Sequence, residues 1–256
     1  MGASTCVACG ECVQACPTGA LLPATGNNKP VKEEIVDSLC PYCGVGCQTR
    51  FHVSGDRIVR VEGRDGPANQ GRLCVKGRFG MDYVNHPHRL TSPLIRKEGV
   101  AKSAAPDIDP GNLLDHFREA SWEEALDLAA KGLRDIRDTH GGGALAGFGS
   151  AKGSNEEAYL FQKLVRTGFR TNNVDHCTRL CHASSVAALM ETIGSGAVTA
   201  PFAEAANADV IIVIGSNTAN NHPVAATFIK NAVDAGTELI VMAPRGNGLT
   251  RHASQH

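Results

Sequence analysis

The sequence has almost no net charge, few aromatic residues and no long hydrophobic run. Its 25 Lys and Arg balance 26 Asp and Glu to a formal charge of −1, whereas a nucleic-acid-binding domain carries a clear excess of positive charge. Because no apolar run approaches the ~20 residues that cross a bilayer, we expect no membrane span. The first residues show no basic stretch followed by an apolar one, so we expect no signal peptide and a cytoplasmic protein.

Cysteine, by contrast, is abundant. The ten cysteines form three groups: Cys6, Cys9, Cys12 and Cys16; then Cys40, Cys43, Cys47 and Cys74; and finally Cys177 and Cys181. An even number permits a disulfide framework, but such frameworks are typical of small secreted domains. Most of these thiols are separated by only two or three residues, and this bunching favours metal centres.

The first group has the spacing C-x2-C-x2-C-x3-C-P and ends at Cys16-Pro17. This spacing is typical of bacterial ferredoxins that bind a [4Fe–4S] cluster, whereas a zinc site normally uses two separated pairs of ligands. In two-cluster ferredoxins the fourth cysteine binds the other cluster. Cys16 therefore either completes its own cluster or serves a cluster whose partner run is absent, and we favour the second interpretation.

The second group places three close thiols before one distant thiol, Cys74. Apolar and β-branched residues at 50–53 and 57–61 flank the turn Ser54-Gly55-Asp56, a pattern that predicts a β-hairpin. The hairpin would bring Cys74 back toward Cys40, Cys43 and Cys47. The four thiols then suit a second cubane cluster, and a zinc ribbon is the alternative.

The middle of the chain changes from cysteine motifs to helix signals. Residues 17–39 and 98–112 contain proline, glycine and asparagine and are predicted to be irregular connections. Capping boxes at Ser121–Glu124 and Ser154–Glu157 predict helices that run to about Asp138 and Phe169. Between these helices, Ala144 to Phe148 is predicted to form a short buried strand.

The C-terminal part predicts a parallel sheet. A strand at 209–214, a helix at 223–235 and a strand at 238–242 make a βαβ unit with a right-handed crossover. Ligands of such sheets bind beyond the carboxyl ends of the strands. The polar loops 215–223 and 244–248 leave those ends, and they either bind phosphates and bases or are ordinary turns. No G-x-G-x-x-G follows the strand, so a standard dinucleotide fingerprint is absent.

The third group contains the pair Cys181-His182, which precedes a segment of small residues predicted to be helical. A thiol at a helix N-terminus beside an imidazole is readily available as a thiolate, and so is a candidate for chemistry. A buried structural cysteine next to a hydrogen-bonded core histidine is the alternative interpretation.

The order of four motifs gives the chain a specific resemblance. The runs at 40–47, 74–78, 86–96 and 172–182 together resemble the molybdopterin-dependent formate dehydrogenases, in particular the catalytic α subunit of the soluble, NAD-linked kind. The resemblance covers essentially the whole chain. It implies an α/β protein with small α+β iron–sulfur modules.

Three domains follow from that resemblance. It implies a partial ferredoxin-like [4Fe–4S] segment at 1–30, a small β-rich molybdopterin-oxidoreductase [4Fe–4S] domain at 31–97, and part of a doubly wound, parallel-sheet molybdopterin-binding domain at 98–256. In the family, the second cysteine group holds a cluster, and a lysine at the position of Lys76 lies between cluster and pterin.

The resemblance also implies a catalytic centre. Cys181 matches the family's cysteine or selenocysteine ligand to molybdenum or tungsten, and His182 matches its active-site histidine. The loops after the strands would contact the two guanine-dinucleotide pterins; the expected contact residues are Gly215, Asn217, Asn220, His222, Pro244 and Arg245.

The implied activity is oxidation of formate to carbon dioxide. Electrons would pass from the pterin through the cluster of the second group, then through that of the first, to a flavin- and iron–sulfur-bearing subunit that reduces NAD. A related nitrate reductase is an alternative, although those enzymes typically place methionine where this chain has His182. A non-catalytic iron–sulfur subunit is another, but it would lack the Cys-His pair.

Three departures from the family limit this interpretation. The family's catalytic subunits are far longer, their formate-binding arginine lies beyond residue 256, and Ala243 stands where relatives usually carry an acidic residue. We therefore expect a fragment whose two ends fall inside domains and which does not oxidise formate by itself.

Overall fold

The computed structural model describes residues 6–22, 32–102 and 109–256. They belong to two compact units, one formed by residues 1–87 with 199–256 and the other by residues 88–198. Across the described parts of the chain, no helix combines the length and the apolar character needed to cross a membrane. The irregular connection predicted around Pro23 to Pro30 lies outside the described residues.

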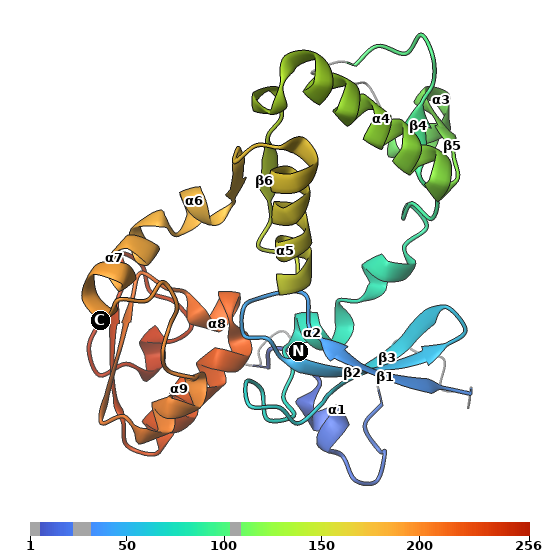
Figure 1. Ribbon diagram of the computed structural model, residues 1–256. Coiled ribbons are helices and arrows are strands. Elements are labelled where there is room, and N and C mark those ends of the chain that lie inside the picture. Colours follow the sequence, from blue (N-terminus) through green and yellow to red (C-terminus); the bar gives the residue numbers. More distant parts are fainter. Residues whose placement is uncertain (1–5, 23–31, 103–108) are drawn as a thin grey trace. The chain divides into compact units, whose positions relative to one another are not determined.

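The first unit begins with the short helix α1 (Glu11–Ala15) and a three-stranded antiparallel sheet. The sheet consists of β1 (Glu34–Leu39), β2 (Gln48–Ser54) and β3 (Arg57–Gly63), in that order (Figure 1). The predicted hairpin is confirmed as β2–β3, and Gly55 supplies the positive φ of 60° in its turn.

The irregular connection predicted for residues 17–39 is wrong at its end, because residues 34–39 form β1. Every residue of β1 is exposed, so burial contributes little to its formation. The strand is held by antiparallel pairing with β2, in a register that sets Glu34 opposite Val53 and Leu39 opposite Gln48. A pairing of this kind is not encoded in the local sequence.

The hairpin leads through an irregular loop into α2 (Val75–Phe79) and a 3-10 turn at Asp82–Asn85. The fully buried Asn69 organises this loop. Its amide nitrogen donates to the carbonyls of Gln48, Arg64 and Arg72, and its side-chain oxygen accepts from the Gln48 N–H. One side chain therefore fixes the path that brings Cys74 back to the start of β2.

The same unit ends in the predicted βαβ arrangement. After a 3-10 segment at Phe202–Asn207 come β8 (Val210–Ile214), α8 (Thr218–Asn221), α9 (Pro223–Asp234), β9 (Glu238–Met242) and a 3-10 turn at Thr250–His252. The strands β8 and β9 are parallel and in register from Val210 with Glu238 to Ile214 with Met242. The prediction of a parallel pair is confirmed.

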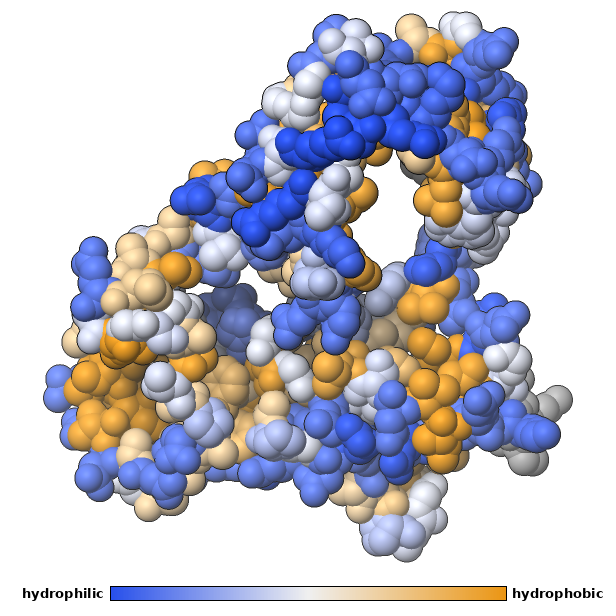
Figure 2. Space-filling model, viewed as in Figure 1, coloured by the Kyte–Doolittle hydropathy of each residue, from blue (hydrophilic) through white to orange (hydrophobic). Residues whose placement is uncertain are grey.

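Alternation along these two strands separates their faces. Val213, Leu239 and Val241 pack with Ala226 and Ile229 of α9 in a buried core. The intervening side chains point the other way, and Val210, Ile212, Ile214 and Met242 are exposed. This accords with the hydrophobic surface visible at the lower left of Figure 2.

A second core joins the cysteine-bearing part to α9. Val224, Ala225 and Phe228 of α9 pack with residues of the loops and strands around the second cysteine group; these are Val45, Cys47, Val61, Leu73 and Met81. The N-terminal turn of α9 is thus part of the same hydrophobic core as the cysteine loop.

The second unit contains the remaining elements. They are β4 (Leu94–Arg96), a 3-10 turn at Pro110–Asn112, α3 (Leu113–His116), β5 (Phe117–Glu119), α4 (Trp122–His140), a 3-10 turn at Gly142–Ala144, β6 (Gly147–Gly149), α5 (Asn155–Lys163), a π-helical segment at Leu164–Phe169, β7 (Val174–His176), α6 (Thr178–Cys181) and α7 (Ala183–Ile193). The strands β4 and β5 are antiparallel, whereas β6 and β7 are parallel.

Both predicted helix starts are present. Ser154 and Glu157 form the complete capping box of α5. At α4 the hydroxyl of Ser121 accepts from the N–H of Glu124 at 3.1 Å, but the Glu124 carboxylate forms an ion pair with Arg118 instead of reaching back to the cap.

The strand predicted at 144–148 begins later than expected. Residues 142–144 form a 3-10 turn, and β6 covers Gly147–Gly149. At Gly142 a Cβ would lie 2.5 Å from the carbonyl oxygens of both Phe169 and Arg170. This close approach of backbone to backbone keeps the start of the segment in a turn.

Substitution of Asn69 tests the importance of its loop. Asn69→Ala leaves several buried backbone groups without a partner, at a cost of about 1–3 kcal/mol each, so the free energy of unfolding should fall by at least about 3 kcal/mol. Urea unfolding followed by circular dichroism measures this change. The exposed Asn231 provides the control Asn231→Ala, and equal unfolding midpoints for the two variants would contradict the assigned role.

Candidate cluster and cofactor site

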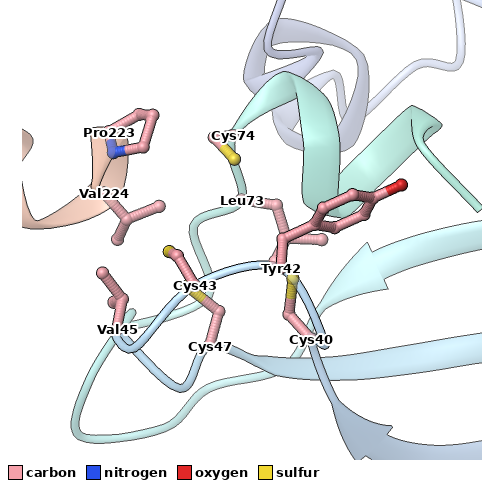
Figure 3. Close-up of a pocket in the computed structure, with 10 residues that line it drawn as sticks. Cys40, Tyr42, Cys43, Val45, Cys47, Leu73, Cys74, Pro223 and Val224 are labelled. Carbon is pink, nitrogen blue, oxygen red and sulfur yellow. The ribbon is translucent and has the colours of Figure 1, made fainter. Parts of the chain in front are cut away.

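Four cysteines of the second group line one pocket. Cys40, Cys43 and Cys47 come from the loop between β1 and β2, and Cys74 is the residue that precedes α2. Figure 3 shows these four side chains around a common space with Val224 at its side. The pocket is completed by apolar and small residues, namely Tyr42, Val45, Leu73, Gly77 and Pro223.

The thiols of this pocket are partly or fully buried. Burial raises the pKa of the Cys40 thiol, and it raises that of Cys47 to about 12, with the neighbouring thiols acting in the same direction. Gly77 faces the thiols, and a Cβ there would lie in van der Waals contact with Cys40 Sγ and Leu73, at 3.4 Å from each. A larger residue at 77 would intrude into the space between the thiols.

The four thiols lie around a pocket and do not converge on the position of a single metal ion. Within the described ranges, no group of three or more His, Cys, Asp and Glu side chains lies close enough to hold a single metal ion. A zinc ion would need four ligands, with sulfur at about 2.3 Å, whereas a cubane cluster separates its four cysteines. The donor set and its geometry therefore fit a [4Fe–4S] cluster better than the zinc ribbon considered as an alternative.

The first group lies on a separate loop around α1. Cys12 is in α1, Cys6 and Cys9 precede it, and Cys16 follows it. The Cys16 thiol contacts the Thr18 hydroxyl at 3.5 Å, and this hydrogen bond, together with backbone N–H groups up to Leu21, lowers the pKa of Cys16 to about 7. Cys16 thus interacts with the segment that follows it, and the interpretation that it serves another cluster stays a prediction.

The predicted pterin contacts gather beside the second cysteine group. Lys76 extends from α2, and its Nζ donates to the carbonyl of Asn220 at 3.4 Å. The loop that holds Asn220 begins at Gly215, where φ is 61°, and the N–H of Gly215 donates to Met242 at the end of β9. The structure therefore brings Lys76 to the carboxyl edge of the β8–β9 pair.

The second loop at this edge is tied to the first. Asn247 donates from its side chain to the carbonyl of Ser216 at 3.4 Å, while its side-chain oxygen accepts from the N–H of Leu249. Pro244 and Arg245 lie in the chain between the end of β9 and Asn247, and both are exposed. Asn247 was not among the predicted site residues, although its position between two glycines marked it as a turn residue.

Two buried polar atoms at this edge have no hydrogen-bond partner among the described residues: Asn217 Oδ1 and His222 Nδ1. A buried polar atom without a partner costs about 1–3 kcal/mol, so it is normally satisfied by a ligand or by water. Both belong to the set predicted to contact a pterin nucleotide. The side chains at this edge thus fit a polar ligand.

The Cys181-His182 pair belongs to the second unit. Cys181 is the last residue of α6, His182 precedes α7, and both are exposed. The predicted helix of small residues is confirmed as α7. Nearby, Ala151 after β6 donates its N–H to the thiol of Cys177 after β7, at 3.3 Å. The carboxyl ends of these parallel strands are thus linked just before the Cys-His pair.

A groove of about 820 Å³ lies at the same edge. The ends of β6 and β7 and one side of α5 line it, including Ser150, Lys152 and His176. A groove at the carboxyl edge of parallel strands is the usual place for a ligand in α/β folds. Sequence reasoning missed residues 149–153, because glycine and serine in a loop resemble ordinary turn chemistry.

Comparisons with known proteins match three parts of the chain. The molybdopterin oxidoreductase family matches residues 89–256, the molybdopterin oxidoreductase Fe4S4 domain matches residues 33–86, and the 4Fe-4S binding domain matches residues 3–22. The chain belongs to the molybdopterin oxidoreductase family. The expected order of iron–sulfur modules followed by an α/β molybdopterin domain is confirmed.

Two curated proteins illustrate the similarity of this chain to longer relatives. It is 38% identical to "F420-dependent formate dehydrogenase 2 subunit alpha" of Methanococcus maripaludis, over 87% of this chain and 30% of the relative. It is 37% identical to "Formate dehydrogenase H" of Escherichia coli, over 86% of this chain and 30% of the relative. The chain therefore spans less than a third of the length of these relatives.

A solved structure confirms the fold of the chain. Acetylene hydratase from Pelobacter acetylenicus matches 85% of this chain and 28% of its own, with a TM-score of 0.67 and 20% sequence identity. At that identity the likeness concerns the fold alone.

Loss of one thiol from the pocket tests the ligand assignment. Cys74→Ala removes the ligand that directly precedes α2, so the protein should lose the more stable of its clusters after anaerobic reconstitution. Iron content and the EPR signal of the reduced protein measure this loss. Cys177→Ala, which changes an exposed thiol outside both cluster groups, should keep both signals; unchanged stable iron in Cys74→Ala would show the assignment to be wrong.

Proposed function

We propose that the chain is part of the catalytic α subunit of a formate dehydrogenase, which oxidises formate to carbon dioxide. The observation that carries this proposal is the Cys181-His182 pair before α7, in a family member whose relatives include enzymes named formate dehydrogenases. Because the chain spans 30% of those relatives, the activity belongs to a longer polypeptide.

A molybdenum or tungsten ion held by two guanine-dinucleotide pterins would supply the redox chemistry, in which formate loses two electrons and a proton to become carbon dioxide. Cys181 would provide a soft thiolate ligand for that ion. His182 would supply an imidazole that can accept the released proton. Their exposure leaves both side chains accessible to a ligand.

The cofactor would lie at the carboxyl edge of the parallel strands. The residues proposed to hold it are Lys76, Gly215, Asn217, Asn220, His222, Pro244 and Arg245. The partnerless polar atoms of Asn217 and His222 support this assignment, and Arg245 offers a positive charge to a phosphate. Lys76 would join cofactor and cluster, because its helix directly follows Cys74 while its ammonium group reaches Asn220.

Electrons would then leave through the two cysteine groups. We assign the first step to a [4Fe–4S] cluster on Cys40, Cys43, Cys47 and Cys74, and the second to a cluster on Cys6, Cys9 and Cys12, with Cys16 serving another cluster. A flavin- and iron–sulfur-containing subunit that reduces NAD is the proposed acceptor. Cluster-type cysteine spacing without a disulfide framework suits the reducing cytoplasm.

The proposal divides the chain into three domains, at 1–30, 31–97 and 98–256. The matched ranges 3–22, 33–86 and 89–256 support such a division. Within this division, α9 of the third domain shares a hydrophobic core with the cysteine loop of the second.

Cys181→Ala tests the proposed catalytic ligand in a polypeptide of the relatives' full length. Because the change removes a ligand from the catalytic metal alone, formate oxidation should fall by at least about a hundredfold, while iron content stays as in the unchanged protein. Formate-dependent dye reduction and iron analysis on the same preparation measure both quantities. Near-normal turnover would refute the role of Cys181.

The 256-residue chain by itself should not oxidise formate. The arginine that the family resemblance assigns to formate lies beyond residue 256, so the anion would lack a bidentate, charge-assisted anchor. An anaerobic assay of iron-replete protein supplied with molybdenum or tungsten tests this expectation. Sustained dye reduction that depends on formate and is lost in Cys181→Ala would show that these residues suffice.

A further inference from the structure

The short helix α2 carries a buried charge that the proposed function does not use. The Arg78 side chain is only 5% exposed, and it points away from the pocket of the second cysteine group toward the loop of the first. Its Nε donates to the carbonyl of Cys9 at 2.8 Å, and one terminal nitrogen donates to Gln14 at 2.6 Å. The other terminal nitrogen forms an ion pair with Glu11.

The partners of Arg78 are themselves fixed to the second module. The Glu11 carboxylate accepts the N–H of Leu73 at 2.8 Å. The Gln14 side chain accepts the N–H of Gly63 at 3.0 Å and donates to the carbonyls of Gly63 and Gly71. Every one of these bonds joins the α1 loop to the segment that ends at Cys74.

Glycine permits this close approach. At Gly10, which has a φ of 76°, a Cβ would lie 2.5 Å from the Cδ of Arg78 and 2.7 Å from the ring of Phe79. Within the second module, a Cβ at Gly63 would lie 1.9 Å from the carbonyl oxygen of Gly71, so the two carbonyls that Gln14 contacts are also held close together. At Gly10 the first loop therefore lies directly against the Arg78 side chain, with no space for a larger residue.

Arg78 links the two cysteine groups through hydrogen bonds. The N–H of Arg78 donates to the carbonyl of Cys74 at 3.0 Å, and its Nε reaches the carbonyl of Cys9. We propose that Arg78 is a positioning residue that docks the first cluster loop onto the second and connects Cys74 to Cys9 for electron transfer. The inference rests on both cysteine groups binding clusters, and does not depend on formate as the substrate.

Arg78 also places a positive charge beside the first loop. The potential of an iron–sulfur cluster depends on nearby charge, on hydrogen bonds and on exposure to solvent. A guanidinium stabilises the reduced, more negative cluster, so its removal should lower the reduction potential of the first cluster. The second cluster should be affected less, because the guanidinium donates to the first loop.

The test compares Arg78→Gln and Arg78→Lys with the control Arg57→Gln, which removes the same charge at the exposed turn of the hairpin. After anaerobic reconstitution, iron analysis establishes cluster content without formate. Redox titration followed by EPR then measures the two potentials and the magnetic interaction between the reduced clusters. Arg78→Gln should lower the potential of the first cluster and weaken the magnetic interaction, whereas Arg57→Gln should change neither quantity.

Hydrogen exchange provides a second readout that needs no cluster. The amides of Gly63 and Leu73 donate to Gln14 and Glu11, so undocking of the first loop exposes both. Arg78→Lys keeps the positive charge but loses the branched set of guanidinium donors. In this variant, hydrogen exchange at the amides of Gly63 and Leu73 should be faster by at least about tenfold. Unchanged exchange, or unchanged potentials and magnetic interaction in Arg78→Gln, would overturn the proposal, as would a wild-type chain whose first group binds no iron.

Discussion

The convergence of four thiols is the constraint on which the rest of the first unit depends. Cys40, Cys43 and Cys47 share one loop, but Cys74 comes from a segment that must return to them. The hairpin and the Asn69 hydrogen bonds each contribute to that return. The fold of the small domain thus brings together four thiols that a cluster can bridge, and binding of such a cluster would stabilise the folded state.

Three residues in or directly before the short helix α2 point to three different sites. Cys74 precedes the helix at the thiol pocket, Lys76 reaches Asn220 at the edge of the parallel strands, and Arg78 reaches Cys9 in the first cysteine loop. This short segment thereby contacts each proposed site of the electron path. Packing of Val224 and Phe228 into the same core holds the parallel strands in place beside it.

Local signals in the sequence predicted much of the fold. The turn at Gly55, the capping box at Ser154 and the apolar strands β8 and β9 have strong local patterns, and each is confirmed. The strand β1 and the docking by Arg78 could not be predicted in this way. The strand β1 depends on pairing with β2 across the cysteine loop, and Arg78 depends on contacts with a segment far away in the chain. Single residues give no local signal for either.

The candidate site, like the fold, could be predicted from the sequence only in part. Cysteine spacing anticipated the common pocket, and the motif containing Lys76 anticipated its position between the pocket and the loops. The tie made by Asn247 and the groove beside Ser150 emerged only from the folded chain. The catalytic roles of Cys181 and His182 stay predictions, because the chemistry of a Cys-His pair is set by the group it binds.

The central claim is that the second cysteine group holds an iron–sulfur cluster. Mössbauer spectroscopy and metal analysis of a variant in which Cys6, Cys9, Cys12 and Cys16 are all replaced by serine test it most directly, because only the second site remains. About four iron and four sulfide ions per chain, with the spectrum of a cubane, are predicted. About one zinc ion per chain, with no bound iron after reconstitution, would contradict the claim.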